Sequence, residues 1–248
     1  MDTKRIDKHE YFLLKRVGKT ISDYELIENN DRIMVAVSGG KDSLSLLRLL
    51  RVRSNYIPIK YELLAVHIDF GYSPHQVEKL SKYLREQGYQ YHIEERKCDV
   101  KPGEKTNCFW CSWNRRKALF EVADKFGFKK IALAHNKDDL VETVLLNLFY
   151  HGEISTMLPS LEFFNGRFII IRPLIDIEAC ELKRYAEIMQ LPYHEHRCPF
   201  QADTTKRMKV RELISSLSRE NPHIKRNILR SIKGEKILYK PRRMLGLK

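Results

Sequence analysis

Apolar positions along the chain follow two periods in turn. Segments with an apolar residue at every third or fourth position predict helices, and short runs of branched aliphatic residues predict buried strands. The predicted helices cover residues 11–29, 41–53, 73–87, 112–126, 138–150 and 178–190. The predicted strands cover residues 32–38, 62–68, 91–95, 130–134 and 168–172. Because strands and helices alternate at this spacing, the chain is expected to consist of βαβ units.

This alternation predicts an α/β fold with a doubly wound, mostly parallel sheet covered by helices on both faces. We expect a helical N-terminal segment over residues 1–30 and a catalytic domain over residues 31–197. Residues 198–248 lack strand signals and are expected to form a basic, helical C-terminal extension that contributes Cys198. In sheets of this kind, ligands bind beyond the carboxyl ends of the strands.

Composition narrows the class of protein. Hydrophobic residues make up 43% of the 248 residues, which is typical of a globular chain. No apolar run approaches the roughly 20 residues of a membrane-spanning helix, and the N-terminus has no apolar core of a secretory signal. We therefore expect a cytoplasmic protein that does not enter a membrane. In that reducing compartment, five cysteines are better explained by metal or redox chemistry than by disulfides.

The positive charge is concentrated at the C-terminus. The chain has a net charge of +13, and residues 206–248 hold 14 Lys/Arg against 3 Asp/Glu, a net +11. The apolar positions Ile224, Ile228, Leu229 and Ile232 recur at helical spacing, which predicts a docked amphipathic helix. A solubilising basic tail remains an alternative. The favoured interpretation is a surface that binds RNA or DNA.

A glycine-containing loop between the first predicted strand and the next helix indicates a phosphate site. Adjacent glycines let the backbone approach a ligand closely, and the N–H groups at the start of a helix attract anions. Two serines and a lysine add donors, and the aspartate is explained by loop geometry or Mg²⁺ binding. The loop fits neither the Walker A nor the dinucleotide-binding pattern. Its residues are Ser38, Gly39, Gly40, Lys41, Asp42 and Ser43.

Three cysteines form the second candidate site. Cys108 and Cys111 form a Cys-x-x-Cys pair at a polar turn just before a predicted helix, and Cys198 could supply a third thiolate. The spacing alone leaves structural cysteines, zinc (with Cys98 or His196 as a fourth ligand), a redox or persulfide pair and an iron–sulfur cluster open. From the spacing alone, a zinc site and an iron–sulfur cluster are equally favoured. Cys98 and Cys180 are expected to be free and buried.

These motifs resemble those of the PP-loop ATP pyrophosphatase superfamily, and within it the TtcA-type group of tRNA 2-thiolation enzymes, which is also similar to the TtuA-type thiolases. The resemblance spans nearly the whole chain. It rests on the phosphate loop, Cys108-x-x-Cys111, the Ala-His-Asn-Lys-Asp-Asp run that begins at Ala134, Ile171-Arg-Pro-Leu, Cys198 and Asn221-Pro-x-x-Lys-Arg-Asn. Members of the superfamily split ATP into AMP and pyrophosphate and transfer AMP to a substrate oxygen.

The resemblance implies an ATP- and Mg²⁺-dependent tRNA sulfurtransferase. It would adenylate the C2 oxygen of a pyrimidine and replace that oxygen with sulfur. Cytidine is the favoured pyrimidine. Three cysteines (Cys108, Cys111 and Cys198) would hold a 4Fe-4S cluster. A sulfur donor (sulfide, a persulfide or a carrier protein) and a homodimer are also expected. The chain lacks the paired zinc-binding cysteines found at both ends of the TtuA type.

By position, the resemblance also assigns residue roles. Asp139, Arg115 and Lys41 would be catalytic, and the phosphate loop with His67 and Ala134 would bind ATP. The group usually has glycine where this chain has Ala134. From the residues themselves, Asp138 and Asp139 are also explained as carboxylates of a first helical turn, and Arg115 and Arg116 as solvated side chains. Trp110 and Trp113 could stack on a base, although packing against the sheet is the favoured interpretation.

Two rival functions remain open at this stage. One is a lysidine-synthetase-like enzyme that forms an amide or amine on tRNA, with the cysteines in a structural zinc site. The other is a non-catalytic RNA-binding module, which the complete phosphate loop argues against. Dependence of product formation on the cysteines separates the sulfurtransferase from the ligase.

Overall fold

The computed structural model describes residues 7–96, 108–194 and 206–233. The helices are α1 (Lys8–Asp23), α2 (Lys41–Ser54), α3 (Pro74–Glu86), α4 (Cys108–Lys125), α5 (Lys137–His151), α6 (Ala179–Ile188), α7 (Lys206–Glu220) and α8 (Ile224–Lys233). The strands are β1 (Asp31–Ala36), β2 (Tyr61–Asp69), β3 (Tyr91–Glu95), β4 (Lys130–Ala132), β5 (Ser160–Phe163) and β6 (Phe168–Ile171).

The chain divides into two compact units. The first comprises Met1–Lys137 and Leu158–Ala202, and the second comprises Asp138–Met157 and Asp203–Lys248, each as far as its residues are described. The first unit therefore holds the sheet, and the second holds nearly all of α5 together with α7 and α8. No helix in the described ranges is both long enough and apolar enough to span a membrane.

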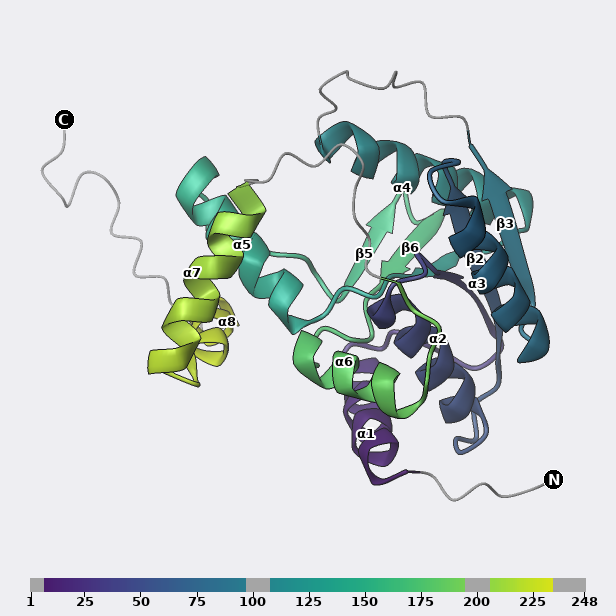
Figure 1. Cartoon of the computed structure of the whole chain (residues 1–248), viewed down its shortest axis with the longest axis horizontal. Coiled ribbons are helices and arrows are strands. Elements are labelled where there is room, and N and C mark those ends of the chain that lie inside the picture. Colours follow the sequence, from purple (N-terminus) through teal and green to yellow (C-terminus); the bar gives the residue numbers. More distant parts are fainter. Residues whose placement is uncertain (1–6, 97–107, 195–205, 234–248) are drawn as a thin grey trace, which may run out of the picture. The chain divides into compact units, whose positions relative to one another are not determined.

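The strands of the first unit form a sheet in the order β3-β2-β1-β4-β6-β5 (Figure 1). β1 pairs in parallel with β2 and β4, and β4 pairs in parallel with β6. β5 is the antiparallel strand at one edge. β2 and β3 are added on one side of β1, and β4, β6 and β5 lie on its other side, so the order reverses between β1 and β4. In an open α/β sheet, this switch point is where a crevice for a ligand forms.

Helices cover both faces of the sheet, as predicted. Side chains of a strand point alternately to its two faces. Ile33 and Val35 of β1 therefore join the core formed with α1, α2, α3 and α6, whereas Met34 between them joins the core formed with α4. Leucines give α2 an almost wholly buried apolar surface within the first of these cores. Burial on both faces matches the consecutive apolar residues at the centre of β1, Ile33, Met34 and Val35.

A buried ionic cluster joins three helices of the first unit. Glu10 on α1 is 4% exposed, and its Oε1 accepts from Tyr185 Oη on α6 at 2.7 Å and from Arg48 Nε on α2 at 3.0 Å. Burial, together with the hydrogen bond to Glu10, raises the pKa of the Tyr185 phenol. The carboxylate therefore has both a charged and a neutral donor, which offsets the cost of burying it.

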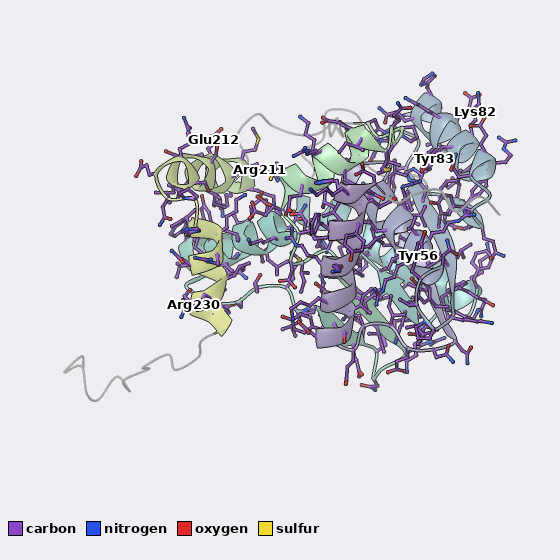
Figure 2. The ribbon with its side chains drawn as sticks, turned by 90° about the horizontal axis from the view of Figure 1, so that it is seen from below. Tyr56, Lys82, Tyr83, Arg211, Glu212 and Arg230 are labelled. Atoms are coloured by element: carbon purple, nitrogen blue, oxygen red, sulfur yellow. The ribbon has the colours of Figure 1, made fainter. Side chains whose placement is uncertain are left out.

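The second unit is a small helical cluster. Val141 and Leu145 of α5 pack against Val210 and Ile214 of α7, and Ile228 and Leu229 of α8 lie against this core. The prediction of an amphipathic C-terminal helix is thus confirmed. Arg211 of α7 forms two hydrogen bonds with the buried Glu142 of α5, at 2.7 and 3.1 Å. Figure 2 labels this arginine on α7, and Arg230 on α8, where it is exposed.

Three elements differ from the sequence prediction. α1 ends at Asp23 rather than residue 29, because Glu25 adopts a left-handed φ of 51° and the Leu26 N–H bonds back to the Ile21 carbonyl. α4 begins at Cys108, so the Cys-x-x-Cys pair lies in a first helical turn rather than before the helix. β5 was not predicted, although the Asn165-Gly166 dipeptide that follows it is a hairpin signal.

The ionic cluster generates a stability prediction. Glu10→Gln removes the negative charge and leaves the half-buried Arg48 without its counter-ion, so we expect the free energy of unfolding to fall by about 2–3 kcal/mol. Urea denaturation measures this change. Glu62→Gln is the matched control, because Glu62 pairs with Arg32 on the surface and should cost less than about 1 kcal/mol. Equal losses in the two variants would refute a stabilising role for the cluster.

Candidate functional site

The phosphate loop connects β1 to α2 at the switch point of the sheet. Its two serines fix its shape. The Ser38 N–H donates to Ser43 Oγ at 3.1 Å, the Gly40 N–H donates to Ser38 Oγ at 3.3 Å, and Ser43 Oγ donates to the Gly40 carbonyl oxygen at 2.9 Å. The loop is therefore held in place by internal hydrogen bonds before any ligand arrives.

Gly39 is required by both conformation and space. Its φ is +86°, in the region that favours glycine, and a Cβ atom there would lie 2.2 Å from Cε1 of His194. The His194 N–H also donates to the Gly39 carbonyl oxygen at 3.2 Å. His194 was missed by the sequence analysis, because it belongs to no motif and lies 155 positions away in the chain.

The start of α2 is suited to an anion. Gly40 is its N-cap and has no side chain to cap the first N–H groups of the helix. Those groups carry the positive end of the helix dipole. Lys41 Nζ lies 2.9 Å from both carboxylate oxygens of Asp42, and both side chains remain partly exposed. The loop therefore offers a lysine whose charge can be shared between Asp42 and a bound phosphate.

The loop after β4 lies against the phosphate loop. Asn136 is 3% exposed, and its Nδ2 donates to Asp42 Oδ2 at 3.3 Å. Ala134 in the same loop packs against the core shared with α2. From β2, His67 is also nearly buried, and its Nδ1 donates to the Val37 carbonyl oxygen at 2.7 Å. The structure thus brings His67, Ala134 and the phosphate loop together at one edge of the sheet.

Arg172 follows β6 at the same edge and was not predicted as a site residue. It is 5% exposed, its Nε donates to His135 Nδ1 at 3.3 Å, and its Nη1 donates to the Leu158 carbonyl oxygen. Burial, together with the like charge of Arg116, lowers the pKa of Arg172 to about 10. The guanidinium is therefore still charged at neutral pH. In the sequence, the Ile-Arg-Pro-Leu motif that contains Arg172 was the signal that could have identified it as a site residue.

Both neighbouring arginines of α4 are exposed. Arg115 lies over the ring of Phe70, which follows β2, with 5.8 Å between its Cζ and the ring centroid. Trp113 is 50% exposed and has Lys117 Nζ 5.6 Å from its ring centroid. The expectation that Trp113 packs against the sheet is thus wrong, because its position on α4 faces solvent. The side chain of Trp110 lies outside the described part of the chain.

Asp138 and Asp139 belong to the second unit, in the first turn of α5. Asp138 Oδ1 lies 2.6 Å from Lys225 Nζ of α8, and Asp139 Oδ1 lies 4.0 Å from Arg207 Nη1 of α7. The hydrogen bond with Glu142, with further attraction from Asp139 and Asp138, raises the pKa of Arg211. The two carboxylates therefore lie among basic side chains of α7 and α8. A catalytic role for Asp139 stays a prediction.

Two of the three proposed cysteine ligands lie among the residues that the structure describes. Cys108 and Cys111 are three positions apart in the first turn of α4, and Cys198 lies outside the described residues, as do Cys98 and His196. Within residues 7–96, 108–194 and 206–233, no cluster of three His, Cys, Asp or Glu side chains suited to a metal is found. Cys180 is exposed on α6. The expectation that it is buried is wrong, since the apolar side of α6 is formed by its neighbours Leu182, Tyr185 and Ala186.

Comparison with known proteins gives consistent matches. The family model described as a PP-loop domain matches residues 11–217. The tRNA-cytidine(32) 2-sulfurtransferase of Geobacter sulfurreducens is 39% identical and aligns over 98% of this chain and 95% of its own length. The enzyme of the same name from Syntrophotalea carbinolica is 38% identical, over 87% of this chain and 85% of its own.

A solved structure extends the comparison to the fold. The U34-tRNA thiolase NcsA from Methanococcus maripaludis, with its 4Fe-4S cluster, matches with a TM-score of 0.76 and 25% identity, over 91% of this chain and 78% of that chain. The resemblance deduced from the motifs is confirmed by these matches. The chain belongs to the PP-loop domain family and, within it, to the tRNA-cytidine(32) 2-sulfurtransferases.

Proposed function

We propose that this chain replaces the C2 oxygen of a cytidine in tRNA with sulfur, using ATP to activate that oxygen. The observation that carries the proposal is the 39% identity to a tRNA-cytidine(32) 2-sulfurtransferase across 98% of the chain. The phosphate loop at the switch point of the sheet supports it independently, because its geometry suits the phosphates of a nucleotide. We place the reaction in the cytoplasm.

The first step is adenylation. The cytosine O2 attacks the α-phosphorus of ATP, the bond to the β-phosphate oxygen breaks, and pyrophosphate leaves. The N–H groups at the start of α2, the hydroxyls of Ser38 and Ser43 and the ammonium of Lys41 would stabilise the developing negative charge. Asp42 would hold Mg²⁺ on the phosphates, and His67 and Ala134 would frame the adenosine.

The second step exchanges oxygen for sulfur. A sulfur nucleophile attacks C2, the C2–O bond breaks, and AMP leaves with the former O2. Asp139 would act as the acid/base or positioning group, and Arg115 would act near the phosphates. The donor would be sulfide, a persulfide or a carrier protein, and with a persulfide a thiol would then cleave the S–S bond and leave one sulfur on C2. A homodimer remains part of the proposal.

Three cysteines would hold a 4Fe-4S cluster. Cys108 and Cys111 share one turn of α4, and Cys198 would complete the set. Three thiolate ligands leave one iron able to bind an exogenous sulfur, which is the chemistry that the cluster would supply. Arg115 and Arg116 follow one turn further along α4. The donor set therefore fits such a cluster, and the solved thiolase NcsA carries one.

Cysteine replacement tests the sulfur step. Cys108→Ser should abolish formation of 2-thiocytidine in tRNA and lower the iron and labile sulfide content, because one of three thiolates is lost. Mass spectrometry of tRNA nucleosides and a colorimetric iron assay are the measurements. Cys180→Ser, at an exposed cysteine of α6, is the matched control. It should keep both the formation of 2-thiocytidine and the iron and sulfide content. A Cys108→Ser enzyme that still forms its tRNA product at the normal rate would favour the ligase with a structural zinc site.

Replacement of Gly39 tests the phosphate loop. Gly39→Ala combines a left-handed φ, which costs about 1–2 kcal/mol for alanine, with a collision with His194. We expect ATP affinity to fall at least tenfold, as measured by calorimetry. Gly88→Ala is the control, because Gly88 has a φ of +66° and its nearest neighbour atom would lie 3.9 Å from an added Cβ. Unchanged ATP affinity in Gly39→Ala would exclude this loop as the nucleotide site.

Replacement of Asp139 tests the catalytic carboxylate. Asp139→Asn should lower kcat by about 10²–10⁴-fold, the usual contribution of a general acid or base, with little change in the KM for ATP. Single-turnover thiolation of tRNA gives the rate. Glu153→Gln, at an exposed carboxylate of the same unit, should leave kcat unaltered. A rate for Asp139→Asn within a factor of about three of the native rate would remove Asp139 from the mechanism.

A further inference from the structure

Four charged side chains are buried in the described part of the chain, and three of them have a counter-ion. Glu10 pairs with Arg48, Lys130 Nζ lies 2.6 Å from Asp31 Oδ2, and Glu142 pairs with Arg211. These pairs follow the rule that a buried charge needs an opposite charge beside it. The fourth is Arg172, and it departs from the rule.

Arg172 is fixed in position without being neutralised. Its Nε donates to His135 Nδ1 and its Nη1 donates to the Leu158 carbonyl oxygen, and both acceptors are formally neutral. No carboxylate within residues 7–96, 108–194 and 206–233 forms an ion pair with it. The two hydrogen bonds orient the planar guanidinium, and the charge itself is left for another group to balance.

Arg116 makes the uncompensated charge larger. It is exposed on α4, close enough for its like charge to contribute to the lowered pKa of Arg172. A buried guanidinium that hydrogen bonds orient, with a second cation near enough to act on it, suits a bound oxyanion.

The surrounding loop places this pair of arginines beside the adenylation site. Residues 133–136 follow β4, and Asn136 in this loop contacts Asp42 of the phosphate loop. His135, the preceding residue, contacts Arg172. One short loop therefore connects the phosphate loop with Arg172, and both lie at the carboxyl edge of the sheet.

We propose that Arg172 and Arg116 form a second phosphate-binding site, separate from the phosphate loop, with His135 orienting Arg172. Its ligand is a phosphate group of the reaction's own polyanions: the backbone of the RNA next to the target nucleotide, or the pyrophosphate that adenylation releases. The assignment of these two sources rests on the proposed function. The site itself rests on a buried, oriented guanidinium that has no counter-ion among residues 7–96, 108–194 and 206–233.

Binding of inorganic phosphate to the full-length protein tests the site. His135 supplies a local probe, because its ring nitrogen accepts from Arg172. We expect phosphate to shift the His135 ring ¹⁵N resonances, assigned with His135→Gln. Arg116→Gln, at an exposed position that does not threaten the fold, should weaken this response about three- to tenfold, in line with the loss of one nearby charge. Arg172→Met should abolish it.

A stability measurement separates a binding role from a structural one. Without phosphate, Arg172→Met should be as stable as the native protein or more so, because an uncompensated buried charge is replaced by an apolar chain of similar length. Phosphate should raise the Tm of the native protein and raise that of Arg172→Met less. If Arg172→Met is strongly destabilised and the His135 resonances of the native protein ignore phosphate, Arg172 is structural and the proposal fails.

Competition identifies the source of the phosphate group. Displacement of inorganic phosphate from the His135 site by an anticodon stem-loop RNA assigns the site to the RNA backbone, and displacement by pyrophosphate assigns it to the leaving group. If neither competes, the site binds only an adventitious ion and the proposal is overturned. Because no step measures sulfur transfer, a protein that binds phosphate here but does not thiolate tRNA would refute the proposed function alone.

Discussion

The carboxyl ends of the parallel strands share one edge of the sheet, and the arrangement of the site depends on this. β1, β2, β4 and β6 all run in the same direction, so the residues that follow each of them emerge on the same side. The reversal of strand order between β1 and β4 separates the helices that follow these strands and leaves room for a nucleotide. The phosphate loop, His67, the loop of Asn136 and Arg172 come from four strands and converge for this reason.

Charged side chains have different partners in the core and at the carboxyl edge of the sheet. In the core of the first unit, Glu10 has both Arg48 and Tyr185 as partners, and the cluster ties α1, α2 and α6 together. At the carboxyl edge, Lys41 shares its charge with Asp42, and the acceptors that Arg172 has among the described residues are neutral. Uncompensated cations cost stability in the absence of ligand, and they add affinity when an anion binds. The first unit therefore concentrates its unfavourable electrostatics where polyanionic substrates would arrive.

The second unit combines acidic and basic surfaces in a small volume. Asp138, Asp139 and Glu142 of α5 face Lys225, Arg207 and Arg211 of α7 and α8. These pairs explain why the basic C-terminal helices fold against α5 although apolar contacts there are few. Other cations of these helices, such as Arg230, are exposed (Figure 2).

The sequence by itself determined the fold class, the phosphate loop and the family, because these depend on local signals. The apolar periods of strands and helices differ and can be read locally. The six residues Ser-Gly-Gly-Lys-Asp-Ser specify both a tight turn and a set of groups that bind an anion. Element ends were less predictable: α1 stops at a left-handed Glu25, and β5 exists because it pairs with β6 rather than because of its own composition. Only the tertiary structure decided that His194 lies against Gly39 and that Arg172 is buried with His135 as a partner. Such contacts join residues far apart in the chain, and no local pattern records how the folded sheet brings them together.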